Sequence, residues 1–260
     1  MTALFEPSAD GFTAQPLARG PWDARMMHGG APAALLAREI ERLDGAGDMV
    51  VTRLTVEFLG GVPLGVVETA AEVAKPGRRF QLVEATLDAG GQRLCLARAV
   101  RLRRAQIPDT ARTPARDAAR LPPLGQGEPF PPWVQADGPT FYPDAAEIRH
   151  AHGEPGSGAV GAWVRLRGEL VSGEDPSPLV RVAAAADFAN GVSWSLPLDD
   201  WLFVNTDLTI HLHREPEGDW IGLDARTSIS EAGVGVASAT LHDERGPVGL
   251  CAQSLFVERR

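Results

Sequence analysis

Residues 51–59 read Val-Thr-Arg-Leu-Thr-Val-Glu-Phe-Leu, and residues 205–213 read Asn-Thr-Asp-Leu-Thr-Ile-His-Leu-His. The two stretches start 154 positions apart, and Thr, Leu and Thr recur at the second, fourth and fifth places. Both alternate apolar and polar side chains, which is typical of a strand with one buried face. Ala85-Thr86-Leu87 recurs at the same spacing as Ala239-Thr240-Leu241. The sequence therefore predicts two copies of one unit.

An alanine-rich stretch precedes each set of strands. We expect one helix from about Gly30 to Leu43 and another from about Pro178 to Asn190, each followed by about four antiparallel strands. Turn-like residues such as Ala89-Gly90-Gly91 separate the strands. A sheet with one buried face and one apolar helix should pack on each other. The sequence thus predicts an α+β fold built from two similar units.

A proline-rich stretch separates the two copies. Residues 105–141 include Pro122, Pro123, Pro129, Pro131 and Pro132, and such a stretch does not form a central strand or a helix interior. We therefore predict a first unit over residues 1–104, an extended crossover over 105–141, and a second unit over 142–260.

The bulk composition narrows the function. The formal net charge of -9 argues against a nucleic-acid partner, and no stretch approaches the roughly 20 apolar residues of a membrane helix. Two cysteines in 260 residues do not make a disulfide framework. We expect a cytoplasmic protein. His211 and His213 share one strand face, but no third ligand accompanies them, so we expect no metal and no cofactor.

Several short motifs, taken in order, resemble the type II acyl-CoA thioesterase family, with its double-hotdog arrangement of two long central helices wrapped by antiparallel sheets. The motifs are Trp22 followed by Met27-His28-Gly29-Gly30, the helix carrying Ala186-Asp187-Phe188, the strand ending in His213-Arg214, and the closing strand with Gln253. The resemblance implies a hydrolase acting on acyl-CoA through an activated water, and it allows a homodimer.

In that family an Asp on the second helix, a Thr at the start of the next strand and a Gln on the last strand hold the water. The resemblance places the Asp at Asp187 and the Gln at Gln253. Strict register places the hydroxyl position at Asn205, which departs from the family pattern, with Thr206 beside it. The third role therefore stays open between Asn205 and Thr206.

The repeat indicates that the two units share one site. Aligning the copies places Ala37 opposite Asp187, Val51 opposite Asn205 and Ala97 opposite Gln253. Conversely, residues 28–30 are His-Gly-Gly where residues 177–179 are Ser-Pro-Leu. The first unit would supply the N–H groups of Gly29 and Gly30 at a helix start, where amides favour a developing oxyanion. The second unit would supply the side chains that handle the water.

His28 and Asn190 complete the candidate substrate contacts, and we expect the acyl chain in an apolar channel between helix and sheet. Two alternatives remain. One is a hotdog enoyl-thioester hydratase or dehydratase, for which His28 is the candidate acid or base. The other is a non-catalytic acyl-CoA-binding protein, which the Asn205 departure leaves open. The acyl length, the carrier (CoA or carrier protein) and the pathway also remain open.

Overall fold

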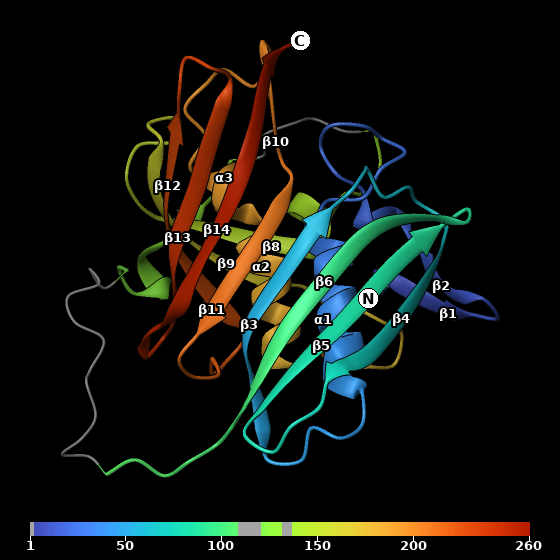
Figure 1. Ribbon diagram of the computed structural model, residues 1–260. Helices are drawn as coiled ribbons and strands as arrows, with labels where there is room; N and C mark the ends of the chain where they lie inside the picture. The colour runs from blue at the N-terminus through green and yellow to red at the C-terminus, as the bar shows by residue number, and fades with distance from the viewer. Residues whose placement is uncertain (1–2, 109–120, 132–136) are drawn as a thin grey trace.

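A computed structural model describes residues 3–108, 121–131 and 137–260. Its strands form one 14-stranded sheet, and every strand pairing within it is antiparallel. The order is β1-β2-β4-β5-β6-β3-β11-β14-β13-β12-β9-β8-β7, with β10 paired to β14 (Figure 1). The strands are β1 (Phe5–Ser8), β2 (Gly11–Ala14), β3 (Met49–Phe58), β4 (Val66–Lys75), β5 (Phe80–Ala89), β6 (Gln92–Arg103), β7 (Glu128–Pro129), β8 (Ala146–His152), β9 (Ala159–Leu166), β10 (Trp201–Asn205), β11 (Asp207–Leu212), β12 (Trp220–Ile229), β13 (Val234–Asp243) and β14 (Gly246–Arg259).

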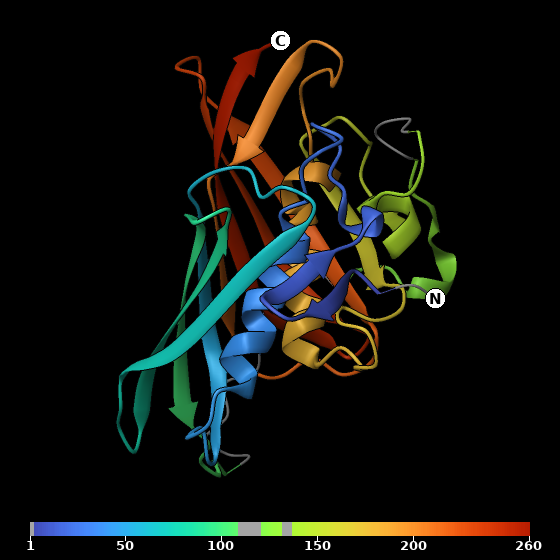
Figure 2. The same ribbon diagram turned by 90° about the vertical axis from the view of Figure 1, so that its right-hand side faces the viewer.

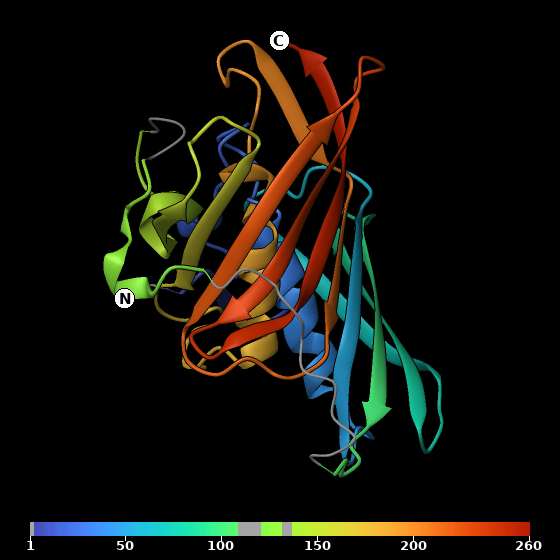
Figure 3. The same ribbon diagram turned by 90° about the vertical axis from the view of Figure 1, so that its left-hand side faces the viewer.

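The helices lie together on one face of this sheet, as the side views show (Figures 2 and 3). They are α1 (Gly30–Arg42), α2 (Pro178–Ala186) and α3 (Phe188–Val192), with short turns η1 (Pro16–Ala18), η3 (Leu124–Gln126) and η4 (Phe141–Ala145). α1 packs on β4, β5 and β6, α2 packs on β9 and β12, and the two helices pack against each other. The second helix differs from the expected 178–190, because it stops at Ala186 and resumes after Asp187.

The two repeats meet edge to edge in the middle of the sheet. β3 pairs with β11, and Thr55 lies opposite Thr209 with the two Oγ1 atoms 3.2 Å apart. These two threonines are the same position of the repeat, 154 residues apart. The local twofold axis that relates the two copies therefore passes between Thr55 and Thr209.

Each helix is preceded by strands that the sequence pattern did not indicate. β1 and β2 come before α1, and β8 and β9 come before α2. β1 and β2 have only four residues each, too few for alternation to stand out from chance. The expected order of one helix followed by about four strands therefore leaves out these strands.

Part of the proline-rich stretch lies on the outer side of the sheet. Trp163 Nε1 on β9 donates to the carbonyl of Pro122 at 2.9 Å. Leu121 is buried in the gap left by Gly222, where a Cβ would be 2.4 Å from the leucine Cδ1. β7 then extends the sheet by pairing with β8. Residues 109–120 and 132–136, including Pro132, lie outside the described residues.

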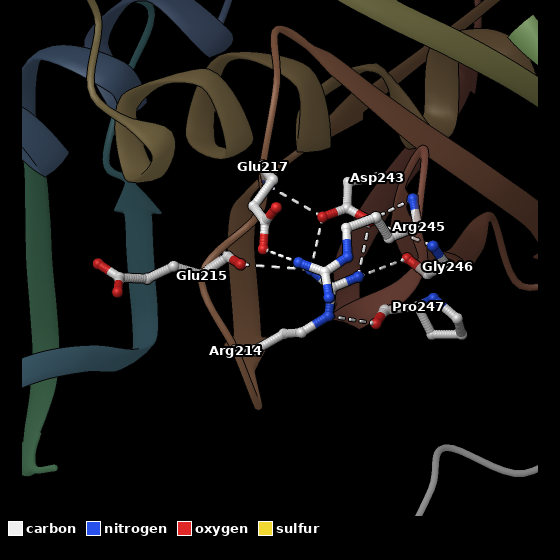
Figure 4. Close-up of polar contacts among 7 residues, drawn as sticks. All are labelled: Arg214, Glu215, Glu217, Asp243, Arg245, Gly246 and Pro247. Atoms are coloured by element: carbon white, nitrogen blue, oxygen red, sulfur yellow. Dashed lines mark hydrogen bonds and ion pairs between the residues drawn. The ribbon is translucent and has the colours of Figure 1, made fainter.

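Buried polar groups fix the ends of several elements. Arg101 is fully buried, and its guanidinium donates to the carbonyls of Ile40 and Leu43 at the C-terminus of α1, where cations are favoured. At the β13–β14 turn, Asp243 accepts a bidentate pair from Arg214 at 2.5 and 2.6 Å (Figure 4). No helix in the ranges described above is long and apolar enough to cross a membrane.

Candidate active site

Backbone hydrogen bonds fix the segment that leads into α1. Gly20 N–H donates to Met26 O, Met27 N–H donates to Val62 O, and His28 N–H donates to Ala18 O, each at 2.8 Å. Gly29 is the N-cap residue and offers no side chain to cap the helix. The first amides of α1 are therefore presented at a fixed place.

Asp187 faces this helix start from the junction between α2 and α3. Its carboxylate is 4% exposed and is held from several sides. Oδ1 accepts from Asn205 Nδ2 at 2.8 Å and from Gln253 Nε2 at 3.2 Å, while Oδ2 lies 3.0 Å from His28 Nδ1. The structure thus brings together one residue from the first unit and three from the second.

Gln253 interrupts the helix at Asp187. In an unbroken α-helix the N–H of Asn190 would donate to the carbonyl of Ala186. Here Asn190 N–H donates to Gln253 Oε1 at 3.1 Å, and Gln253 Nε2 donates to the backbone carbonyl of Asp187 at 3.2 Å. The Ala186 carbonyl instead lies 3.8 Å from the Sγ of Cys251, two residues before Gln253 on β14. Insertion of a side chain into the ladder is a recognised cause of a helix break.

His28 packs against two aromatic rings. Its imidazole stacks on Phe141 at 4.8 Å and meets the ring of Phe188 at a tilt, at 4.5 Å between ring centroids. Nδ1 is 3.0 Å from Gly30 N and 3.0 Å from Asp187 Oδ2. A protonated Nδ1 donates to the carboxylate, whereas an unprotonated Nδ1 accepts from Gly30 N–H. The position of one proton therefore decides which contact is a hydrogen bond.

The two glycines have different surroundings. The N–H of Gly30 is directed at His28 Nδ1, and Gly30 itself is buried. Gly29 lines the open cavity and packs against Asp187, where a Cβ would come within 2.8 Å of Oδ2. Only glycine allows this close approach of the backbone to the carboxylate.

A cavity of about 350 Å³ opens in front of these groups. Its lining is mostly apolar and comes from both units: Gly20, Pro21, Trp22, Asp23, Met26, Met27, His28, Gly29, Pro32, Phe58, Leu59, Gly60, Gly61, Val62, Asp187, Asn190, Gly191, Leu198, Phe203, Val204, Asn205 and Thr206. Trp22 meets Phe203 edge to face at 5.3 Å to form one wall. The fully buried core residues Leu36, Leu54 and Val56 do not line this cavity, and the expected channel between helix and sheet stays a prediction.

The remaining candidates on the second unit differ in their contacts. Asn205 reaches Asp187 through its side chain, whereas Thr206 is exposed and joins the site through its backbone, which bonds Ser254 and Phe58. Asn190 lines the cavity, is 6% exposed, and donates through Nδ2 to Phe203 O at 3.1 Å. The structure therefore brings Asn205 nearer to the carboxylate than Thr206.

Gln253 and the two cysteines lie behind the carboxylate. Gln253 is 1% exposed and does not line the cavity. Burial raises the pKa of Cys95 and of Cys251 to about 12, so both thiols stay protonated at neutral pH and are unsuited to act as nucleophiles. Among the described residues no group of three or more His, Cys, Asp or Glu could hold a metal ion.

The other helix start, at α2, has different chemistry. Ser177 caps it, with Oγ accepting from Val180 N–H at 3.2 Å and donating to Glu41 near the end of α1. Burial raises the pKa of Glu41. A side chain therefore caps the helix start in the second unit, whereas Gly29 at the start of α1 has no side chain to do so.

Two sequence profiles match the chain. One, for the acyl-CoA thioesterase C-terminal domain, covers residues 108–257, and the other, for the N-terminal domain, covers residues 18–103. The chain belongs to the acyl-CoA thioesterase family. It is therefore a thioester hydrolase, and acyl-CoA is the substrate class that the family implies.

Solved structures of similar fold support a hotdog architecture for this thioesterase. A protein assigned as a thioesterase from Novosphingobium aromaticivorans has a TM-score of 0.74 and 21% identity, over 98% of this chain and 99% of that one. One assigned as a thioesterase II from Thermobifida fusca has a TM-score of 0.72 and 18% identity, over 95% and 91%. A hot dog fold protein of unknown function from Alicyclobacillus acidocaldarius has a TM-score of 0.71 and 16% identity, over 96% and 92%. No curated protein matches the sequence.

Proposed function

We propose that the chain hydrolyses acyl-CoA by direct attack of a water molecule that Asp187 deprotonates. The water oxygen forms a bond to the thioester carbon as its proton moves to the carboxylate. The carbon–sulfur bond then breaks, and the proton passes to the thiolate. The products are one free acid and one thiol, so atoms and charge balance.

The contacts of Asp187 support its role as the base. Oδ1 carries two amide donors, whereas Oδ2 lies beside Gly29 and His28 at the cavity. The oxygen nearer the substrate is thus the one that takes the proton. Asn205 orients the carboxylate directly. Gln253 does so partly by breaking the helix, and its burial behind Asp187 favours a positioning role over contact with the water.

The oxyanion would be stabilised by Gly29 N–H at the positive end of α1. Backbone amides at a helix start favour negative charge, and losing one such donor typically costs about 3–4 kcal/mol of activation free energy. His28 Nδ1 lies 3.0 Å from both Gly30 N and Asp187 Oδ2, so its tautomer sets whether it holds the helix start or the carboxylate. We therefore assign His28 a positioning role.

At the level of the fold we propose a tandem of two hotdog units, with α1 and α2 as their central helices. The pairing of β3 with β11 at Thr55 and Thr209 supports this arrangement. So do the matching positions of β1 and β2 before α1 and of β8 and β9 before α2.

The observation that carries the function is the buried Asp187 carboxylate against the glycine helix start, inside a mostly apolar cavity. The test is thiol release from octanoyl-CoA by the parent and by Asp187→Asn. A general base contributes about 10²–10⁴ in rate, so we expect a loss of that order. Asp224→Asn, a half-buried carboxylate outside the cavity that pairs with His152, is the matched control. A parent-like rate for Asp187→Asn in a folded protein would refute the mechanism.

A further inference from the structure

The volume of the cavity in front of Asp187 lies near the lower end of the range usual for ligand sites. Ligand sites for drug-sized molecules usually measure about 300–1,000 Å³, and this one measures about 350 Å³. The same space must also hold the thioester group and the attacking water. The acyl chain therefore has only part of this volume.

On the α1 side, packed core lies directly behind the cavity. α1 contributes only its first turn to the lining, through Gly29 at the cap and Pro32. Behind that turn, Ala33, Leu36 and Ile40 have no exposed surface and belong to the continuous core. A longer chain would have to displace packed side chains, which cores resist.

The side wall is made by Trp22 together with Phe203. Phe203 is 3% exposed and belongs to a small core cluster with Ala237, Leu255 and Val257, against which Trp22 packs. The guanidinium of Arg260 lies over the Trp22 ring at 5.2 Å, a distance at which a cation is attracted to the ring face. The Trp22 indole therefore has partners on more than one side and forms a fixed wall.

We propose that this site selects acyl groups of up to about eight carbons, with Trp22 setting the limit, because the cavity volume lies near the lower end of the usual range. The proposal rests on the proposed function and specifies its substrate. Each added carbon within the cavity buries apolar surface and improves binding. Carbons beyond the limit remain in water or strain the wall, and they give no further gain.

The experiment measures kcat/KM for straight-chain acyl-CoA substrates from butanoyl to hexadecanoyl. For the parent we expect kcat/KM to rise up to about eight carbons and then to level off or fall. For Trp22→Ala we expect the dodecanoyl to octanoyl ratio of kcat/KM to rise by about tenfold, because the removed indole leaves room for more of the chain. A parent whose kcat/KM keeps rising to hexadecanoyl, or an unchanged ratio in Trp22→Ala, would overturn the proposal.

Trp201→Ala is the matched control. Trp201 packs on the same small cluster as Trp22 and also has an arginine, Arg259, over its ring, but it does not line the cavity. It should lose similar stability and keep the parent profile. A shifted profile in Trp201→Ala would attribute the effect to loosening of the cluster and would count against a wall at Trp22.

Binding separates this proposal from the proposed function. Non-hydrolysable thioether analogues of the same chain lengths are titrated calorimetrically against the parent. A dissociation constant that stops improving at about eight carbons supports the size limit even if no acyl-CoA is turned over. Affinity that improves steadily to sixteen carbons refutes the limit, whatever the Asp187→Asn result.

Discussion

The α-carbon of Gly29 packs so closely on Asp187 that a methyl group there would lie 2.8 Å from Oδ2 and 3.1 Å from Oδ1. Gly29→Ala must therefore push the carboxylate or the helix start away. A displacement of about 1 Å can cost about 100-fold in rate, and we expect a loss of that order in thiol release with little change in Tm. Gly125→Ala is the control, since nothing lies within 4 Å of a Cβ there.

A substitution of Gln253 tests whether the helix break positions Asp187. In Gln253→Leu the Asn190 N–H loses its side-chain acceptor, and the ladder can close onto Ala186. The carboxylate also loses one of its two amide donors. We expect kcat to fall by about 10–100-fold, as for loss of a hydrogen bond to a charged group, with KM nearly unchanged. Cys251→Ala removes only the weak thiol contact to Ala186 and should stay within about threefold of the parent. Equal losses in both variants would contradict this role.

The choice between Asn205 and Thr206 is open to a direct comparison. Asn205→Ala removes the 2.8 Å donor to Asp187 Oδ1, and we expect a fall in kcat of about 10–100-fold. Thr206→Ala keeps both backbone hydrogen bonds of that residue and should cost much less. Single-turnover rates with octanoyl-CoA measure the chemical step for each variant. A larger loss in Thr206→Ala would reverse the assignment.

The Arg214–Asp243 pair should set part of the stability (Figure 4). Asp243 has a fully buried side chain and also accepts from the N–H groups of Glu217, Arg245 and Gly246. Arg214→Ala leaves this charge without its cation, and we expect a loss of about 2–4 kcal/mol in the free energy of unfolding. Arg245→Ala breaks only an exposed pair with Glu217 and should change it by less than about 1 kcal/mol.

The Asp243 carboxylate should make the free energy of unfolding depend on pH. Burial acts to raise the pKa of Asp243, but the hydrogen bonds from Arg214 and the backbone outweigh it and lower the pKa from 3.8 to about 2. A folded-state pKa below the unfolded value stabilises the fold above about pH 4, and this contribution is lost as the pH falls towards about 2. Urea titrations at several pH values should show a smaller loss on acidification for Asp243→Asn than for the parent. Parallel losses would contradict the prediction.

Periodic features were visible in the sequence. The 154-residue repeat indicated two matching strands, and β3 and β11 turn out to be neighbours that pair at Thr55 and Thr209. The glycines at the start of one helix and the acid in the other suggested a shared site, and the structure places Gly29 beside Asp187. Repetition and residue chemistry are local properties of the chain, so they can be read without coordinates.

Features that depend on distant contacts were not visible. The helix break at Asp187 depends on Gln253, which lies 66 positions away. The ring that stacks on His28 comes from Phe141, in the stretch expected to be only a crossover. The pairing of Gly30 N–H with His28 depends on a side-chain rotamer. A pattern of residue types does not specify which atoms meet across such separations.

Because Thr55 pairs with Thr209, separating the two units would break the contact between β3 and β11. Severed between the repeats, each half would expose a long, mostly β-branched or apolar strand edge with unpaired N–H and C=O groups, and such edges recruit other strands. A fragment containing only the first unit could satisfy its edge by pairing with another copy across two Thr55 residues. Such an association would carry two glycine helix starts and no Asp187, so it would assemble without being able to activate water.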